Sequence, residues 1–295
     1  MRVSTVILPW QRWREARSTW EEAERLGLYA AYTYDHLSWR NFRERTWFTM
    51  IPTLVAASQV TSSIRLGPLV TSPNFRHPLV LAKDLLALDD VSNGRLTIGV
   101  GSGGTGFDAT VLGQPTWSPT ERHQRFEEFT RTLDALLRES ASTLHGPYYP
   151  VTDSRQVPGP VQLPRPPLYV SALGPRAMSL CVQVADGWIS LSTPSGDGAG
   201  TSFDQLQRQA AAMDERLAEH ERDPRSLERV VLDFESDEKP LASYDAFIDW
   251  AGRLRSLGFD EVVLHWPVAD SQFESDPRVF ERVATEGREA LHGWS

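Results

Sequence analysis

Asp35 and His36 are adjacent residues whose side chains could carry out acid–base chemistry. They follow Thr33 and Tyr34, at the end of a short apolar stretch that is typical of a β-strand. A histidine gains and loses a proton near neutral pH, and a neighbouring carboxylate can orient its ring or bind a cofactor. The pair could equally be polar residues that cap the next helix. Its position in the chain favours neither interpretation, so the fold has to decide.

A glycine-rich segment runs from Gly99 to Gly104 and formally matches the dinucleotide-binding pattern G-x-G-x-x-G. That pattern requires a helix that opens at once and points its N-terminus at the pyrophosphate. The next helical pattern begins only near Pro119, which disfavours a Rossmann-type site. Glycines still let a ligand approach the backbone closely, and a merely flexible loop is the alternative. We expect ligand contacts at four positions of this loop: Gly101, Ser102, Gly103 and Gly104.

A second turn of small residues, which leads into a helix at Pro175, suits a phosphate group. Free backbone N–H groups at a helix N-terminus bind anions, although an ordinary helix start with proline in its first turn is the alternative. The turn consists of Ser171, Ala172, Leu173 and Gly174.

Large aromatic residues lie at or near the ends of expected strands. They could form a wall for a planar ring, or they could simply cover the core. The tryptophans concerned are Trp10, Trp39, Trp47 and Trp266, and His265 directly precedes the last of them.

Several other chemistries have no motif in this sequence. Neither H-E-x-x-H nor paired C-x-x-C motifs are present, so no metal site is expected. The nucleophile elbow G-x-S-x-G and the P-loop pattern are also absent. The adjacent carboxylates Asp89 and Asp90 fall near a helix end, and we interpret them as structural. The single cysteine, Cys181, is expected to fill the core.

Composition narrows the class of protein further. The 295 residues carry 30 basic and 39 acidic side chains, a net charge of -9, which argues against a nucleic-acid partner. The sequence has no run of eighteen apolar residues, so no membrane span is expected. The first nine residues resemble a strand and lack the apolar region of a signal peptide. With one cysteine and no disulfide framework, a reducing, cytoplasmic location is expected.

The dominant pattern along the chain is an alternation of eight strands and eight helices, which predicts one (β/α)8 barrel domain over residues 1–295. An open Rossmann-type sheet is the alternative. Residues 140–167 break the pattern and predict an excursion from the core. In a barrel, chemistry is found where strands end, which places Asp35 and His36 on the functional face. The expected strands are 3–8, 29–34, 64–70, 96–100, 168–171, 188–191, 229–234 and 261–265; the helices are 13–26, 47–60, 78–91, 119–137, 175–185, 203–221, 244–257 and 277–290.

An ordered set of motifs over nearly the whole chain resembles the luciferase-like monooxygenase family. None of these motifs is decisive alone, but their common order is specific. They are Leu26-Gly27 with Thr33-Tyr34-Asp35-His36; Ile64-Arg65-Leu66-Gly67 with Val70-Thr71; Asn93-Gly94-Arg95-Leu96 with Gly99-Val100-Gly101-Ser102-Gly103; Glu121-Arg122 with Arg125-Phe126-Glu127-Glu128; Gly174-Pro175-Arg176-Ala177; Ala185-Asp186-Gly187-Trp188; and Leu257-Gly258-Phe259-Asp260-Glu261-Val262-Val263-Leu264.

The resemblance implies a (β/α)8 barrel that uses reduced FMN or the deazaflavin coenzyme F-420. Asp35-His36 followed by Trp39 resembles the deazaflavin-dependent branch, which includes glucose-6-phosphate dehydrogenases and reductases of secondary metabolism. In that branch the histidine lies beside the reactive ring carbon, the aspartate contacts the deazaflavin, and the tryptophan shapes the substrate pocket.

The resemblance also implies a cis peptide bond between Leu69 and Val70, in a bulge that continues to Thr71 and backs the ring. The glycine loop would meet the ring, and the turn from Ser171 to Gly174 would hold the phosphate. The remaining expected members of the substrate pocket are Trp10, Trp47, Phe107, His265 and Trp266.

Two departures separate this chain from the sugar-phosphate dehydrogenases. Those enzymes carry a glutamate where this sequence has Gly104, and the nearby acid here is Asp108. The spacing between His36 and Trp39 is also one residue shorter. Both differences argue against a glucose-6-phosphate dehydrogenase with the usual acid–base pair.

The leading hypothesis is therefore hydride transfer between coenzyme F-420 and a small organic substrate, with His36 as the proton donor or acceptor or as a group that holds the cofactor. An FMN-dependent monooxygenase and a non-catalytic flavin-binding protein are the alternatives. A homodimer is expected by family analogy alone.

Overall fold

The computed structural model describes residues 1–195 and 200–293, and in them eight parallel strands form one sheet that closes into a barrel. The strand order is β3-β2-β1-β10-β9-β8-β7-β4. Its two ends meet through parallel bridges that pair Leu66 with Leu96 and Thr71 with Val100. This closure confirms the expected barrel and shows that the open-sheet alternative is wrong.

The barrel strands are short and almost entirely buried, as expected for parallel strands covered by helices. They are β1 Arg2–Val6, β2 Ala30–Thr33, β3 Arg65–Pro68, β4 Ile98–Val100, β7 Leu168–Ser171, β8 Gly187–Ser192, β9 Glu228–Asp233 and β10 Glu261–His265.

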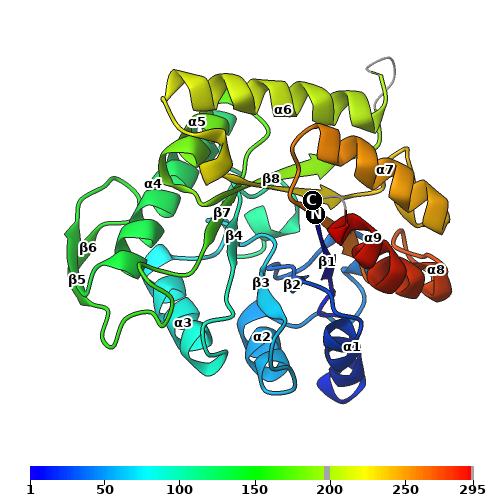
Figure 1. Cartoon of the computed structure of the whole chain (residues 1–295). Helices are drawn as coiled ribbons and strands as arrows, with labels where there is room; N and C mark the ends of the chain where they lie inside the picture. The colour runs from blue at the N-terminus through cyan, green and yellow to red at the C-terminus, as the bar shows by residue number, and fades with distance from the viewer. Residues whose placement is uncertain (196–199, 294–295) are drawn as a thin grey trace.

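Helices surround this barrel, as Figure 1 shows. They are α1 Trp13–Arg25, α2 Met50–Ser58, α3 Pro78–Val91, α4 Pro119–Arg138, α5 Pro175–Val184, α6 Ser202–Glu219, α7 Tyr244–Ser256, α8 Pro277–Arg282 and α9 Arg288–His292, with a π-helical turn Val283–Gly287 between the last two.

Alternation along each strand divides the core into two layers. On β10, Val262 packs in the layer between barrel and helices, whereas Val263 packs inside the barrel. On β9, Val231 and Val230 divide in the same way. The interior layer continues past the end of β2 to Tyr34. A residue just beyond a strand that lies two positions after an inward-facing residue therefore faces the barrel mouth.

The expected excursion is a two-stranded hairpin of β5 Ala141–Leu144 and β6 Val151–Arg155. Asp89 on α3 accepts hydrogen bonds from the backbone N–H groups of Val161 (2.7 Å) and Gln162 (3.1 Å), which tie the segment after the hairpin to the barrel. Asp89 therefore has the structural role that the sequence predicted. Cys181 is fully buried, as also expected.

The largest difference from the expected elements lies between β2 and α2. A helix was predicted from residue 47, but α2 begins at Met50, and a short 3-10 helix η1 at Arg40–Phe42 precedes it. The loop that contains Trp39 is therefore longer and more structured than the helical pattern indicated. None of the described helices is both long and apolar enough to cross a membrane.

Candidate active site

A cavity of about 590 Å3 opens at the carboxyl ends of the strands, where barrel enzymes place their chemistry. Seven of the residues expected at the site line it: His36, Trp39, Leu69, Val70, Gly104, Phe107 and Ser171. The other members of its wall are Tyr34, Ser38, Arg40, Asn74, Gly106, Asp108, Ile189, Leu191, Thr193, Pro194, Leu232, Phe234 and Glu235.

His36 and Asp108 form a pair in this wall. The His36 Nδ1 atom contacts Asp108 Oδ2, and the other carboxylate oxygen accepts the backbone N–H groups of Leu37 (2.8 Å) and Ser38 (3.2 Å). Asp108 is buried, on the 3-10 turn η2 Phe107–Ala109, whereas 31% of the His36 side chain is exposed. The carboxylate thus fixes the ring through Nδ1 and leaves Nε2 available to a ligand.

Asp35 points away from this pair and is 1% exposed. Arg76 donates to both of its carboxylate oxygens (3.0 and 2.6 Å), and the Thr71 hydroxyl donates to one of them (2.7 Å). A direct contact between Asp35 and the cofactor was expected. The structure instead places Asp35 and Thr71 behind the cavity wall, since strand alternation turns Asp35 outward when His36 faces inward.

The peptide bond between Leu69 and Val70 is cis, and both residues line the cavity. Val70 also lies against the glycine loop: a methyl group at Gly101 would stand 2.6 Å from Val70 Cγ2. The need for glycine at this position therefore follows from packing between two loops. Gly101, Ser102 and Gly103 lie beside the wall rather than in it, while Gly104 lines the cavity.

Asn74 is a wall residue that the sequence did not single out. Its Nδ2 atom donates to the Gly104 carbonyl at 3.2 Å, whereas its Oδ1 atom is buried and accepts no hydrogen bond from the described residues. A buried acceptor without a donor is costly. Asn74 therefore offers an acceptor that a ligand N–H or O–H group would satisfy.

Helix α5 begins beside the cavity with an open N-terminus. Gly174 occupies the N-cap position without a side-chain cap, and Pro175 follows it. A methyl group at Gly174 would meet nothing within 4 Å, so space remains in front of the first-turn N–H groups. Ser171 reaches the cavity wall, but Ala172, Leu173 and Gly174 lie outside it and frame this open helix end instead.

His265 is a buried residue of the barrel interior rather than a member of the cavity wall. Its Nδ1 atom lies 3.1 Å from the Asp233 carbonyl and its Nε2 atom 2.7 Å from the Tyr34 hydroxyl, so it donates through Nδ1 and accepts from Tyr34. Its ring stacks on Phe273 at 3.6 Å. Burial lowers the pKa of His265 to about 3, which keeps the ring neutral. His265 therefore lies behind Tyr34 and outside the cavity wall, in which it was expected.

Three tryptophans expected in the substrate pocket lie elsewhere. Trp266 packs against Phe280 in the helix layer, because the residue after inward-facing His265 points outward. Trp10 packs at the edge of the interior layer. Trp47 stacks on Trp39 at 6.0 Å and donates to the His36 carbonyl at 2.8 Å, so it supports the wall from behind.

Most of the wall residues that the sequence analysis missed lie in a loop that directly follows a barrel strand, whereas Ile189, Leu191 and Leu232 lie within the strands themselves. Glu235 and Thr193 stood at expected strand ends, but neither was selected as a site residue. In the part of the chain that the structure describes, three or more metal-binding side chains nowhere gather into a site.

Comparison with known proteins identifies the family to which this barrel belongs. The model of the luciferase-like monooxygenase family matches residues 1–290. The chain belongs to the luciferase-like monooxygenase family. The family that the ordered motifs indicated is thereby confirmed.

Its relatives within the luciferase-like monooxygenases include enzymes named after the deazaflavin. It is 36% identical over 203 residues to an F-420-dependent glucose-6-phosphate dehydrogenase of Beutenbergia cavernae, and 30% identical over 234 residues to one of Intrasporangium calvum. These matches cover 67% and 78% of this chain, and 58% and 67% of the relatives. An FMNH2-dependent dimethylsulfone monooxygenase of Pseudomonas putida is 29% identical over 135 residues, 46% of this chain and 37% of that protein.

Solved structures share the fold at low sequence identity. A coenzyme F-420-dependent tetrahydromethanopterin reductase from Methanopyrus kandleri matches with a TM-score of 0.75 at 19% identity, over 97% of both chains. An F-420-dependent secondary alcohol dehydrogenase matches with a TM-score of 0.79 at 16% identity, over 96% of this chain and 97% of that one. Both confirm the luciferase-like barrel.

Proposed function

We propose that this protein is an oxidoreductase that transfers a hydride between coenzyme F-420 and a small organic substrate. The observation that carries the proposal is the His36–Asp108 pair in the cavity wall, which Leu69 and Val70 also line. The relatives named after this coenzyme support the choice of cofactor.

The residues present fit a deazaflavin. Leu69 and Val70 supply an apolar surface for a ring, and the unpaired Asn74 Oδ1 supplies an acceptor. The open N-terminus of α5, reached through Ser171 to Gly174, suits a phosphate group. When bound, the coenzyme would supply the hydride-transfer chemistry, and the chain would position it and keep water away.

His36 would hold or move the proton that accompanies the hydride. Asp108 keeps Nδ1 occupied, so the proton exchanged with a substrate belongs to Nε2. The carboxylate also stabilises the ring when it is positively charged. Asp35 would act on the cofactor site indirectly, by holding Arg76 and Thr71 under the wall.

An FMN-dependent monooxygenase is the second candidate, and the similarity to the dimethylsulfone monooxygenase favours it. Fluorescence titration of the purified protein with coenzyme F-420 and, separately, with FMN distinguishes the two. We expect saturable binding of the deazaflavin. Tight FMN binding without deazaflavin binding would contradict the proposal. If coenzyme binds but no turnover follows with any enone, imine or alcohol, a non-catalytic flavin-binding protein is the better description.

We further propose a cytoplasmic homodimer of single-domain subunits. Exposed apolar side chains on α3 and on the segment joined to it by Asp89 offer a surface for a second copy. Light scattering after gel filtration tests this, with a monomer as the contradicting result. The side chains are Val80, Val91, Val157, Val161 and Leu163.

A further inference from the structure

Arg40 lies at the rim of the cavity with its guanidinium group exposed. Its Cζ atom stands 5.0 Å from the centroid of the Phe234 ring and 5.6 Å from that of Trp39, both of which are cavity-wall rings. In the described part of the chain it forms no ion pair, unlike Arg43 nearby, whose Nε atom lies 3.9 Å from Glu44. Arg40 is therefore a positioned cation without a counter-ion.

The backbone at this rim is held in a conformation that few side chains adopt. Arg40 has φ +40°, and Glu235, another rim residue, has φ +58°. Left-handed backbone at residues other than glycine costs about 1–3 kcal/mol and clusters at ligand-binding sites. The fold thus maintains two strained residues at the cavity entrance, one positively charged and one negatively charged.

The remainder of the cavity limits what this rim can bind. Asp108 is already paired with His36, and the described wall contains no lysine and no second arginine. The wall also contains the carboxylate of Glu235, so its one arginine does not match the two negative charges of a phosphate dianion. Most of the wall is apolar or aromatic: Tyr34, Trp39, Leu69, Val70, Phe107, Ile189, Leu191, Pro194, Leu232 and Phe234.

We propose that the substrate is a flat, largely apolar carbonyl, alkene or imine compound that carries one carboxylate, and that Arg40 determines specificity by pairing with this carboxylate. The inference rests on the proposed function, since it identifies the hydride partner in the same cavity. A bidentate guanidinium–carboxylate contact backed by aromatic faces is geometry that arginine provides and lysine does not. A sugar phosphate fits this wall poorly, because its hydroxyl groups would lose hydrogen bonds to water without gaining enough partners.

The test compares two flat probes that differ in charge, trans-cinnamate and trans-cinnamamide. Each is titrated calorimetrically into the complex with oxidised coenzyme F-420, in which no hydride is available to reduce them. We expect cinnamate to bind about tenfold more tightly than the amide, as a charge-assisted contact implies. Arg40→Met, which keeps an unbranched side chain over Phe234 and Trp39, should reduce this preference to about one. The matched control Arg45→Met should keep it, because the Arg45 guanidinium lies over Phe42 outside the cavity wall and donates to the Asp270 carbonyl at 2.9 Å.

Glu235→Gln should tighten cinnamate binding by a few-fold without changing that of the amide, because it removes an opposing charge. Coenzyme affinity is measured separately for each variant. If the wild-type protein does not bind the coenzyme, the proposed function is contradicted. If the coenzyme binds, equal affinity for both probes or no cinnamate binding would overturn the inference. It would also be overturned if Arg40→Met lowered the affinity for the coenzyme rather than the affinity for cinnamate. The last result would show that Arg40 holds carboxylates of the coenzyme instead.

Discussion

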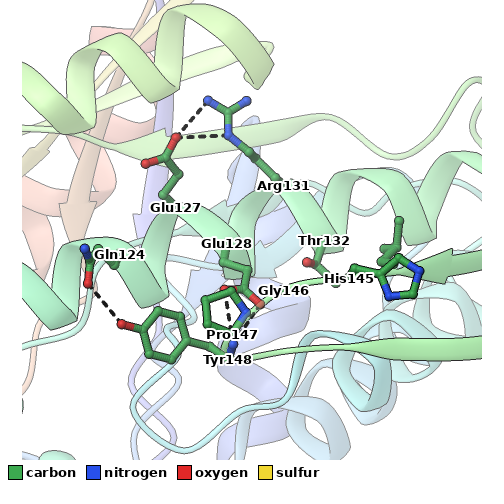
Figure 2. Close-up of a pocket in the computed structure, with 10 residues that line it drawn as sticks. Gln124, Glu127, Glu128, Arg131, Thr132, His145, Gly146, Pro147 and Tyr148 are labelled. Atoms are coloured by element: carbon green, nitrogen blue, oxygen red, sulfur yellow. Dashed lines mark hydrogen bonds and ion pairs between the residues drawn. The ribbon is translucent and has the colours of Figure 1, made fainter.

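Two hollows of similar size contrast in what their polar groups do. The cavity at the barrel mouth has about 590 Å3, and a hollow between α4 and the β5–β6 hairpin has about 530 Å3. In the second hollow, drawn in Figure 2, Glu127 pairs with Arg131 (3.0 Å) and Tyr148 donates to Gln124 (3.0 Å). Glu128 accepts two consecutive backbone N–H groups there, among them that of Tyr149 at 2.6 Å.

At the barrel mouth, by contrast, three polar groups are held in place but keep an unused hydrogen-bonding or charge-pairing capacity. Asn74 Oδ1 has no donor, Arg40 has no counter-ion, and His36 is bonded through Nδ1 alone among the described residues. A satisfied network stabilises a fold, whereas preorganised groups with spare capacity can bind a ligand. Volume does not separate the two hollows, but the state of their hydrogen bonds does.

The largest expected effect comes from substituting one histidine in each of the two hollows, His36 and His145. We expect His36→Ala to lower kcat/KM by about 10²–10⁴, the usual contribution of a positioned acid or base. The matched variant His145→Ala, in the hollow of Figure 2, should leave kcat/KM within about twofold because His145 has no role at the barrel mouth. Steady-state oxidation of the reduced coenzyme measures both. Equal losses would contradict the assignment of the active site.

Asp108→Asn should have the next largest effect. An amide keeps a hydrogen bond to His36 but loses the charge that stabilises the protonated ring, so we expect kcat to fall by about ten- to a hundredfold. The readout is kcat from steady-state oxidation of the reduced coenzyme. A variant with the kcat of the wild type would show that Asp108 serves only to hold Leu37 and Ser38.

Asp35→Asn should chiefly lower stability. It removes a buried carboxylate that pairs with Arg76, a side chain that is 19% exposed, so we expect a loss of about 2 kcal/mol in the free energy of unfolding. Glu127→Gln, which breaks an exposed pair on α4, should cost at most about 0.5 kcal/mol. Urea denaturation compares the two variants. A smaller loss for Asp35→Asn than for Glu127→Gln would show that the buried Asp35–Arg76 pair behind the cavity wall does not stabilise the fold.

The last expected effect concerns the pH dependence of stability. Burial lowers the pKa of His265 to about 3, below its ordinary value of 6.5. The unfolded chain therefore takes up a proton that the folded chain refuses, and stability falls as the pH drops from about 6.5 towards 3. Burial raises the pKa of Asp233 to about 6, which acts in the opposite direction as the pH drops from about 6 to its ordinary value of 3.8.

Comparison of wild type with His265→Asn separates these contributions. Between pH 7 and pH 5, wild type should lose up to about 2 kcal/mol more stability than the variant, at 1.36 kcal/mol per pH unit. Parallel curves for the two proteins would show that His265 is protonated equally in folded and unfolded chains.

Much of the fold was predictable from the sequence because it rests on local patterns. Helix α3 at Pro78–Val91 and strands Leu168–Ser171 and Glu261–His265 lie where apolar periodicity and flanking breakers placed them. Strand ends then predicted the functional face, and Asp35-His36 lies there as expected. The loop after β2 was misjudged, since Trp47 follows a helical pattern but packs on Trp39 instead.

Two neighbouring residues at the end of β10 show a limit of prediction from the sequence. His265 and Trp266 were both expected in the pocket, but alternation turns one inward and the other toward α8. The alternation along β10 indicates the same directions, because Val263 faces the barrel interior and His265 follows it by two positions.

The sequence by itself determined the barrel, the family and the face on which its chemistry lies, because strand and helix periodicity and motif order are local properties of the chain. Only the tertiary structure decided which groups meet. His36 and Asp108 are 72 residues apart, and Asp35 and Arg76 are 41 apart. Such pairs form where loops from different strands converge over the barrel, and the direction of each side chain there depends on packing that no local pattern records.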